Sequence, residues 1–148
     1  MTTYTTTAAP AVDVIPASEA DAATKPLWRV GARAGVIASV AVSVVASVTL
    51  AAGVPLEVEG EAIPIVAFVQ MTLIGTAVGV LLAKALQRWS ARPSQAFVAV
   101  TVVLTALSTV PDFTTADIST ASRLTLALTH LVAAAVVIPA IARRLGER

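Results

Sequence analysis

Four long apolar blocks follow one another along the chain, and short segments rich in proline or charge separate them. They cover residues 34–54, 63–86, 95–110 and 122–141. A helix needs roughly 20 residues to cross the hydrocarbon core of a bilayer, and none of the blocks alternates in polarity as a barrel strand does. The pattern therefore predicts an all-α fold, a four-helix transmembrane bundle in which the third span is the shortest.

Prolines mark the expected ends of these helices. Pro55 follows the first block, Pro93 separates the second from the third, and Pro111 follows the third. Proline fits the first turn of a helix but breaks its interior. We therefore expect residues 27–148 to form one four-span domain. Residues 1–26 are rich in Thr, Ala and Pro without a periodic apolar face, which predicts a disordered cytoplasmic tail.

The distribution of basic residues predicts the orientation. Of the ten Lys and Arg residues, only Arg123 falls in a loop on the opposite side from the other nine. Short loops that are rich in Lys and Arg stay in the cytoplasm. We therefore expect a multi-pass protein of the plasma membrane with both termini in the cytoplasm.

Composition narrows the class of protein further. Hydrophobic residues make up 57% of the chain and charged residues 13%, against about a quarter charged in soluble domains. The formal net charge of +1 is too balanced for a nucleic-acid binder. The chain has no cysteine and one histidine, so we expect no disulfide, no metal site and no cofactor.

A few polar side chains lie within the apolar blocks. Gln70 and His130 each lie seven residues inside the outer end of a span, which is about 10 Å at the helical rise. Ser47 and Thr105 fall at a similar depth, and Asp112 lies close to the outer end of the third span. The first four residues are candidates for a polar layer in the outer leaflet, whereas Asp112 is either a turn and capping residue or part of an outer site near His130.

Two interpretations of this layer stay open. It could form a small pocket that binds a ligand, because imidazole is the side chain that ordinarily changes charge near neutral pH. Alternatively, Gln70 and His130 could simply hydrogen-bond between helices and hold the bundle together.

Small residues recur every four positions on two of the predicted helices. Ser39 and Ser43 belong to such a stripe on the first helix, and Gly75 and Gly79 to one on the second. Small side chains allow helix backbones to approach closely in a membrane. The stripes therefore predict either packing within the bundle or a seam between two copies of the chain.

Two segments carry a resemblance to a known family. They are Val110-Pro111-Asp112-Phe113-Thr114 and the final span from Arg123 to His130, which continues to Pro139 and the Arg143-Arg144 pair. The chain resembles an uncharacterised family of four-helix integral membrane proteins from actinobacteria, described as a domain of unknown function. The resemblance implies the four-helix fold and carries no activity or binding residues with it.

The motifs of common enzymes are missing from the sequence. It contains no phosphate-binding loop, no zinc-protease motif, no nucleophile elbow and no pair of carboxylates within the spans. We therefore expect a non-enzymatic membrane protein that associates with partner proteins, a second copy or lipid through its helices. The alternative is a small-molecule binder or carrier with a pocket around Gln70 and His130.

Overall fold

A computed structural model describes residues 26–58, 60–114 and 118–147. Its elements follow the order α2 (Leu27–Ala51), β1 (Glu57–Val58), β2 (Glu61–Ala62), α3 (Ile65–Trp89), α4 (Pro93–Ser108), α5 (Val110–Thr114) and α6 (Thr120–Gly146). The predicted disordered tail lies outside the described residues, except for Pro26.

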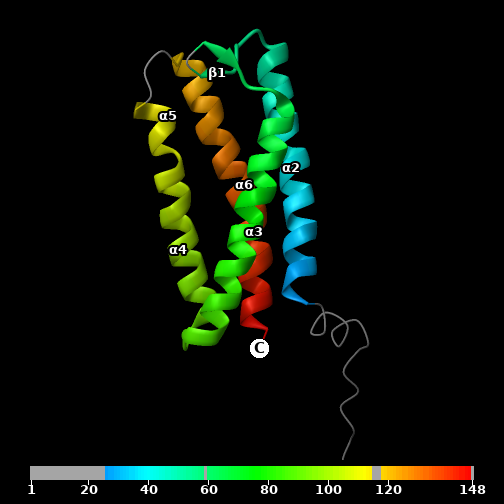
Figure 1. The fold of residues 1–148 in the computed structure, drawn as a ribbon, viewed down its shortest axis with the longest axis vertical. Helices are drawn as coiled ribbons and strands as arrows, with labels where there is room; N and C mark the ends of the chain where they lie inside the picture. Colours follow the sequence, from blue (N-terminus) through cyan, green and yellow to red (C-terminus); the bar gives the residue numbers. More distant parts are fainter. Residues whose placement is uncertain (1–25, 59, 115–117, 148) are drawn as a thin grey trace, which may run out of the picture.

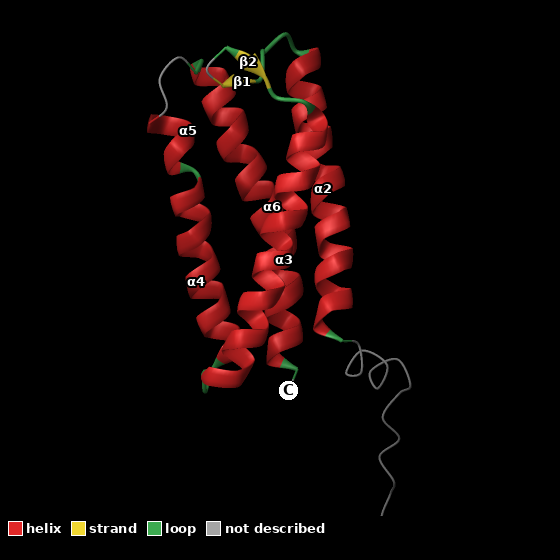
Figure 2. Cartoon of the chain, viewed as in Figure 1, coloured by secondary structure: helices red, strands yellow, loops and turns green. Residues whose placement is uncertain are grey.

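The long helices run side by side (Figure 1). α2 begins, α3 turns into α4, and α6 ends at one end of the bundle, which we call the terminal end. The β1–β2 hairpin and α5 lie at the opposite end, the hairpin end (Figure 2). Four segments are long and apolar enough to cross a membrane, which confirms the predicted fold class.

The observed spans are longer than the predicted ones. α2 begins at Leu27 rather than at residue 34, and α6 extends from Thr120 to Gly146. The third span does not end near residue 110, because α5 continues α4 after a break at Thr109. Together they form a 22-residue segment, Pro93–Thr114. Pro111 lies in the first turn of α5, where its missing N–H costs little.

Close backbone packing around α2 organises the bundle. α2 packs against both α3 and α6, and the residues that it buries are mostly small: Gly31, Ala34, Gly35, Ala38, Ser39 and Ala46. A Cβ added at Gly35 would lie 3.1 Å from Thr76 Cγ2, and one added at Gly31 would overlap Val80. Both glycines therefore permit α3 to approach α2.

The two glycines predicted to pack on α3 behave differently. A Cβ at Gly79 would meet Ile141 Cδ1 at 3.9 Å, an ordinary contact, whereas nothing lies within 4 Å of one at Gly75. Gly75 is exposed, and no other helix of the described chain packs against it. The close approach depends on Gly31 and Gly35 because they lie on the face of α2 that is covered by α3.

Apolar packing joins all four helices only at the terminal end. There, one buried cluster contains Leu27 of α2, Ala83 of α3 and Phe97 of α4 together with three residues of α6: Ile141, Ala142 and Leu145. A second cluster toward the hairpin end contains Val42, Ala46, Leu56, Phe68 and Leu126, and α4 contributes nothing to it. Phe97 is the one buried residue of α4. The hairpin-end half of α4 therefore lacks an apolar anchor.

Hydrogen bonds attach the α2–α3 connection to α6. The Ser122 hydroxyl donates to the Pro55 carbonyl at 2.5 Å, and the Ser119 side chain caps α6 by accepting from the Ser122 N–H at 3.1 Å. Gly60 has φ of +81°, the left-handed conformation that a side chain disfavours, at the turn between β1 and β2. These contacts place the hairpin over one end of the bundle.

We predict that Gly31→Ala and Gly35→Ala each destabilise the bundle by about 1–3 kcal/mol, because the new methyl group meets a stiff β-branched side chain. Gly75→Ala is the matched control and should leave stability unchanged or raise it by about 0.5–1 kcal/mol through helix propensity. Thermal unfolding in detergent measures all three. A loss at Gly75 as large as at Gly31 would contradict this packing.

Candidate functional site

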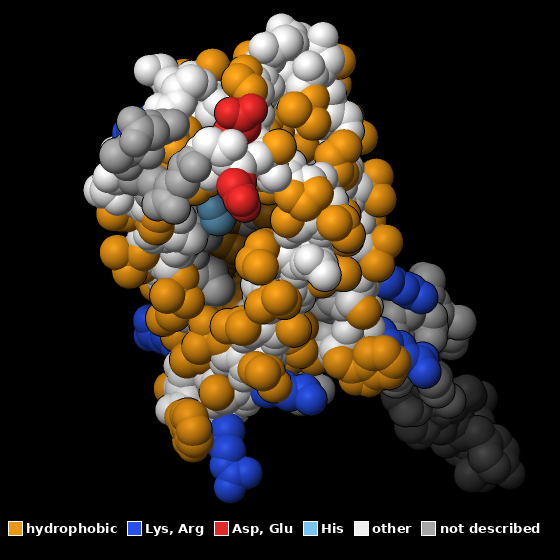
Figure 3. Space-filling model, turned by 45° about the horizontal axis from the view of Figure 1, so that its top comes forward, with side chains coloured by type: hydrophobic (Ala, Val, Ile, Leu, Met, Phe, Trp, Pro, Cys, Tyr) orange, Lys and Arg blue, Asp and Glu red, His pale blue; other side chains and the backbone are white. Residues whose placement is uncertain are grey.

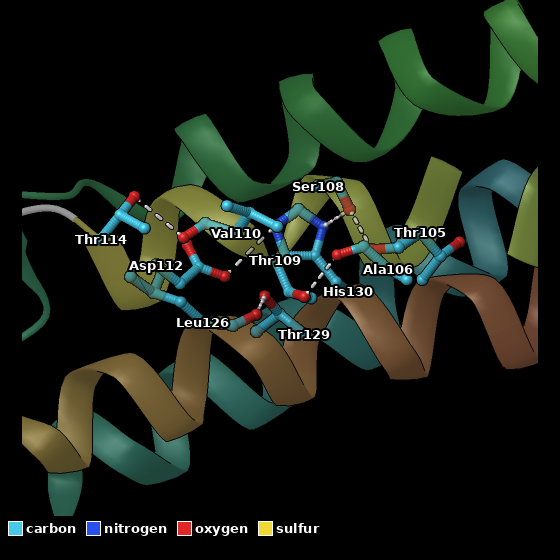
Figure 4. Close-up of polar contacts among 10 residues, drawn as sticks. All are labelled: Thr105, Ala106, Ser108, Thr109, Val110, Asp112, Thr114, Leu126, Thr129 and His130. Carbon is cyan, nitrogen blue, oxygen red and sulfur yellow. Dashed lines mark hydrogen bonds and ion pairs between the residues drawn. The ribbon is translucent and has the colours of Figure 1, made fainter. Parts of the chain in front are cut away.

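Three polar side chains meet near the hairpin end, where α4, α5 and α6 approach one another (Figure 4). His130 of α6 lies between Ser108, the last residue of α4, and Asp112 in the first turn of α5. His130 Nδ1 is 3.2 Å from Ser108 Oγ, and His130 Nε2 is 3.8 Å from Asp112 Oδ2. We call these residues the histidine cluster.

The members of the histidine cluster differ in their access to solvent. The His130 side chain is 40% exposed, whereas the Asp112 side chain is 12% exposed. Asp112 Oδ2 is buried and has no hydrogen-bond partner. The break at Thr109 turns α5 so that this carboxylate points to α6 (Figure 4). A buried polar atom without a partner is costly, so this oxygen requires an explanation.

The Ser108 hydroxyl lies between the Thr105 carbonyl and the imidazole. It donates to the Thr105 carbonyl at 2.7 Å, and its oxygen is 3.2 Å from His130 Nδ1. The tautomer of the imidazole decides whether Nδ1 donates to this oxygen or faces it with a lone pair. When Nδ1 carries a proton, the Ser108 oxygen accepts from it.

The structure brings together only part of the predicted polar layer. Asp112 does contact His130. Gln70 is exposed on α3 and has no hydrogen-bond partner in the described part of the chain, and Ser47 lies in a groove between α2 and α3. The Thr105 hydroxyl donates to the Thr101 carbonyl at 2.8 Å instead of facing the imidazole. Equal depth did not bring these residues together because the helices turn their side chains in different directions.

Ser108 was missed by the sequence analysis. The available signal was its position four residues before Asp112, since residues four apart share a face of a helix. No group of three His, Cys, Asp or Glu side chains comes together among the described residues in a way that suits a metal ion.

A groove runs along the outside of the bundle between α2 and α3, with a volume of about 480 Å³. Ser39, Ser43 and Ser47 lie along it, with Val69 and Leu73 on the α3 side. Four exposed valines of α2 line the other side: Val36, Val40, Val44 and Val48. We call this surface the serine groove.

The serines of this groove stand apart from other hydroxyls in the helices. Thr72, Thr101 and Thr125 each donate to the carbonyl four residues earlier, at 2.6–3.0 Å. Ser43 and Ser47 have no hydrogen-bond partner in the described structure, and Ser39 Oγ is buried without one. Ser39 is 5% exposed. The serine groove therefore combines a small-residue stripe with an unsatisfied hydroxyl.

Charge is distributed unevenly between the two ends of the bundle. In Figure 3 the acidic side chains lie toward the hairpin end, basic side chains gather at the terminal end, and the imidazole lies in a hollow below the acidic side chains. The Arg29 guanidinium lies 5.3 Å from the centre of the exposed Trp28 ring at the terminal end. Tryptophan and basic residues are typical of a membrane boundary.

Comparison with known proteins identifies the family. Residues 22–147 match the model of a family of unknown function, DUF6069. The chain belongs to this family. The expected resemblance to a domain of unknown function is thereby confirmed, over nearly the whole length of the chain. No curated protein and no solved structure matches the chain. Membership in DUF6069 assigns no activity, ligand or partner, so functional inference depends on the two sites described above.

We predict that His130→Leu lowers the unfolding free energy by about 1–3 kcal/mol, because it removes the imidazole that contacts Ser108 Oγ at 3.2 Å and faces the buried Asp112 carboxylate at 3.8 Å. Adding Asp112→Leu should recover most of that loss, since replacing both polar partners is nearly neutral. Thermal unfolding in detergent tests the pair. Losses that simply add in the double variant would show that the two side chains are not coupled.

Proposed function

We propose that this protein is a non-enzymatic, multi-pass protein of the plasma membrane whose serine groove binds a second copy of the chain. The observation that carries this proposal is the pair of hydroxyls of Ser43 and Ser47, which line the groove and have no hydrogen-bond partner among the described residues. Lipid tails offer no hydrogen bond to such groups, whereas a neighbouring helix does.

The surface around the groove is self-complementary. Val36, Val40 and Val44 are 58%, 60% and 56% exposed and repeat with the same four-residue period as the serines. Ridges of this period fit into grooves of the same period on another helix. A two-fold axis places the ridge of each copy in the groove of the other. Because both copies insert in the same orientation, this axis runs along the membrane normal.

Membrane energetics also favour this kind of contact. Lipid is as apolar as the valines, so burying them against a partner gives no hydrophobic gain. Helices associate instead through close packing over small residues, with hydrogen bonds that contribute about 0.6 kcal/mol each. The serine groove offers both, because its central residues are small and their hydroxyls are unused.

The small-molecule alternative has less support. It places a ligand between Gln70 and His130, but Gln70 is exposed on α3 and makes no hydrogen bond to any described residue. Asp112 Oδ2, the polar atom most in need of a partner, is closed to solvent. A ligand would therefore need a rearranged bundle before it could reach the carboxylate oxygen.

Cysteine cross-linking tests the dimer directly. The chain has no cysteine, so a disulfide formed by a single-cysteine variant joins two copies. Ser43→Cys should cross-link in native membranes under mild oxidation, whereas Leu104→Cys, exposed on α4, should not. Ser43→Ile, which fills the groove, should abolish the association. Equal cross-linking at both positions would indicate random collision and contradict the proposal.

We further propose that the terminal end faces the cytoplasm, and with it both termini. The described basic residues at that end include Arg29, Arg33, Arg88, Arg92 and Arg143, and their short segments fit the positive-inside rule. The predominance of Arg over Lys also fits an actinobacterial source.

Labelling of intact cells tests this orientation. A membrane-impermeant maleimide should modify Glu61→Cys, on the exposed hairpin, without lysis. Arg92→Cys, between α3 and α4, should react only after the membrane is opened. The reverse pattern would place the hairpin in the cytoplasm.

A further inference from the structure

The contacts of the histidine cluster raise the question of how many protons its two titratable side chains, His130 and Asp112, hold together. His130 Nδ1 faces Ser108 Oγ at 3.2 Å, and His130 Nε2 faces Asp112 Oδ2 at 3.8 Å. When the Ser108 hydroxyl donates to the Thr105 carbonyl, at 2.7 Å, both ring nitrogens face an acceptor. A neutral imidazole has only one N–H, whereas an imidazolium donates from both nitrogens. Both contacts are then satisfied together only when the pair holds one proton more than a neutral imidazole and a carboxylate do.

No other donor supplies this proton among the described residues. Asp112 Oδ2 is buried and has no hydrogen bond, so a water-sized ligand does not reach it from outside. A proton can still reach the pair through the imidazole ring, because the His130 side chain is 40% exposed.

We propose that His130 and Asp112 together bind one proton from the aqueous phase at the hairpin end, and that this proton holds the adjoining half of α4 against α6. The proton adds to the pair without breaking any other bond. It lies either on Nε2, as an imidazolium beside a carboxylate, or on Oδ2, as a carboxylic acid that donates to Nε2. Both descriptions contain one proton, which belongs to the pair as a unit.

The packing of α4 explains why this proton matters for its position. α4 is held at the terminal end by Phe97, its one buried residue. Beyond it, α5 is attached to α6 where the Arg123 guanidinium donates to the Phe113 carbonyl at 2.6 Å. Between these points an apolar groove of about 650 Å³ runs along the α4–α6 seam, past Thr105 and Leu131. Loss of the proton would therefore let this stretch of α4 bow outward.

Few other charges face the pair. The described halves of α2 and α3 nearest the hairpin carry no charged side chain, and Ser108 of α4 does not titrate. Arg123 lies two turns from His130 on α6, and Glu57 and Glu61 are exposed on the hairpin. We call the arrangement in which α4 lies against α6 the closed state. The proton binds more tightly to the closed state than to the one in which α4 has bowed outward, so the closed state prevails at low pH and is lost as pH rises.

Two readouts on the full chain test the proposal. The chain has one histidine, so a ¹⁵N-histidine-labelled sample gives the imidazole signals of His130 alone. Spin labels at Leu107→Cys and Leu128→Cys, both exposed, report the distance between α4 and α6. Labels at Val98→Cys and Arg143→Cys, near Phe97, provide the control pair. Labelled chains are diluted with unlabelled chains so that only distances within one chain are measured.

We expect the 107–128 distance to lengthen as the pH rises, with the same midpoint as the imidazole signals, while the control distance stays constant. Asp112→Asn carries its own N–H donor toward Nε2. In this variant the imidazole should still titrate while the 107–128 distance stays short throughout.

His130→Gln removes the imidazole ring, so the 107–128 distance should no longer depend on pH. A 107–128 distance that does not follow the imidazole signals in the wild-type background would overturn the proposal. A pH-dependent distance that persists in Asp112→Asn would overturn it as well. These results are independent of dimer formation, because the serine groove lies between α2 and α3.

Discussion

The close approach of α2 to its neighbours is the contact on which the rest of this bundle depends. Within a bilayer, apolar side chains gain nothing by leaving lipid, so helices adhere through close packing and the dispersion contacts that it brings. Gly31 and Gly35 remove the side chains that would hold α3 away, and Ala38 and Ala46 are fully buried on the same helix. α2, α3 and α6 thereby form a tight core.

α4 completes the bundle under different conditions. It shares one apolar cluster with the other helices, at the terminal end, and reaches α6 at the hairpin end through polar atoms. Hydrophobic packing does not depend on pH, whereas a contact through imidazole and carboxylate does. The bundle therefore combines a closely packed core of three helices with a fourth helix whose last residue, Ser108, contacts the imidazole of α6.

The sequence predicts the large features of this fold because they follow from strong, local signals. Hydropathy identifies four spans, and prolines mark their ends to within several residues. The third span was predicted too short because Pro111 was taken as a stop, whereas it begins a further short helix. The first span was predicted to begin too late, because Arg29 and Arg33 lie within α2. Helices continue beyond the hydrocarbon core to the interface, where basic side chains reach water.

The sites were less predictable because they depend on helix rotation. Depth along a span follows from counting residues, but the direction of a side chain does not, and Gln70 and His130 at equal depth point to different surroundings. Ser108 and Asp112 meet His130 because α4 breaks at Thr109, which no periodic pattern reveals. The Ser39–Ser43 stripe follows from the sequence, whereas the unused hydroxyl of Ser39 depends on side-chain contacts that the stripe does not encode.

The most direct test of this account is a native mass spectrum of the full chain released from lipid nanodiscs under gentle activation. The serine groove predicts a species of twice the 15.0 kDa chain mass in the wild type. It also predicts a single-chain species when Ser43 and Ser47, which line the groove, are both replaced by isoleucine. A wild-type spectrum that contains only single chains would contradict the proposed self-association.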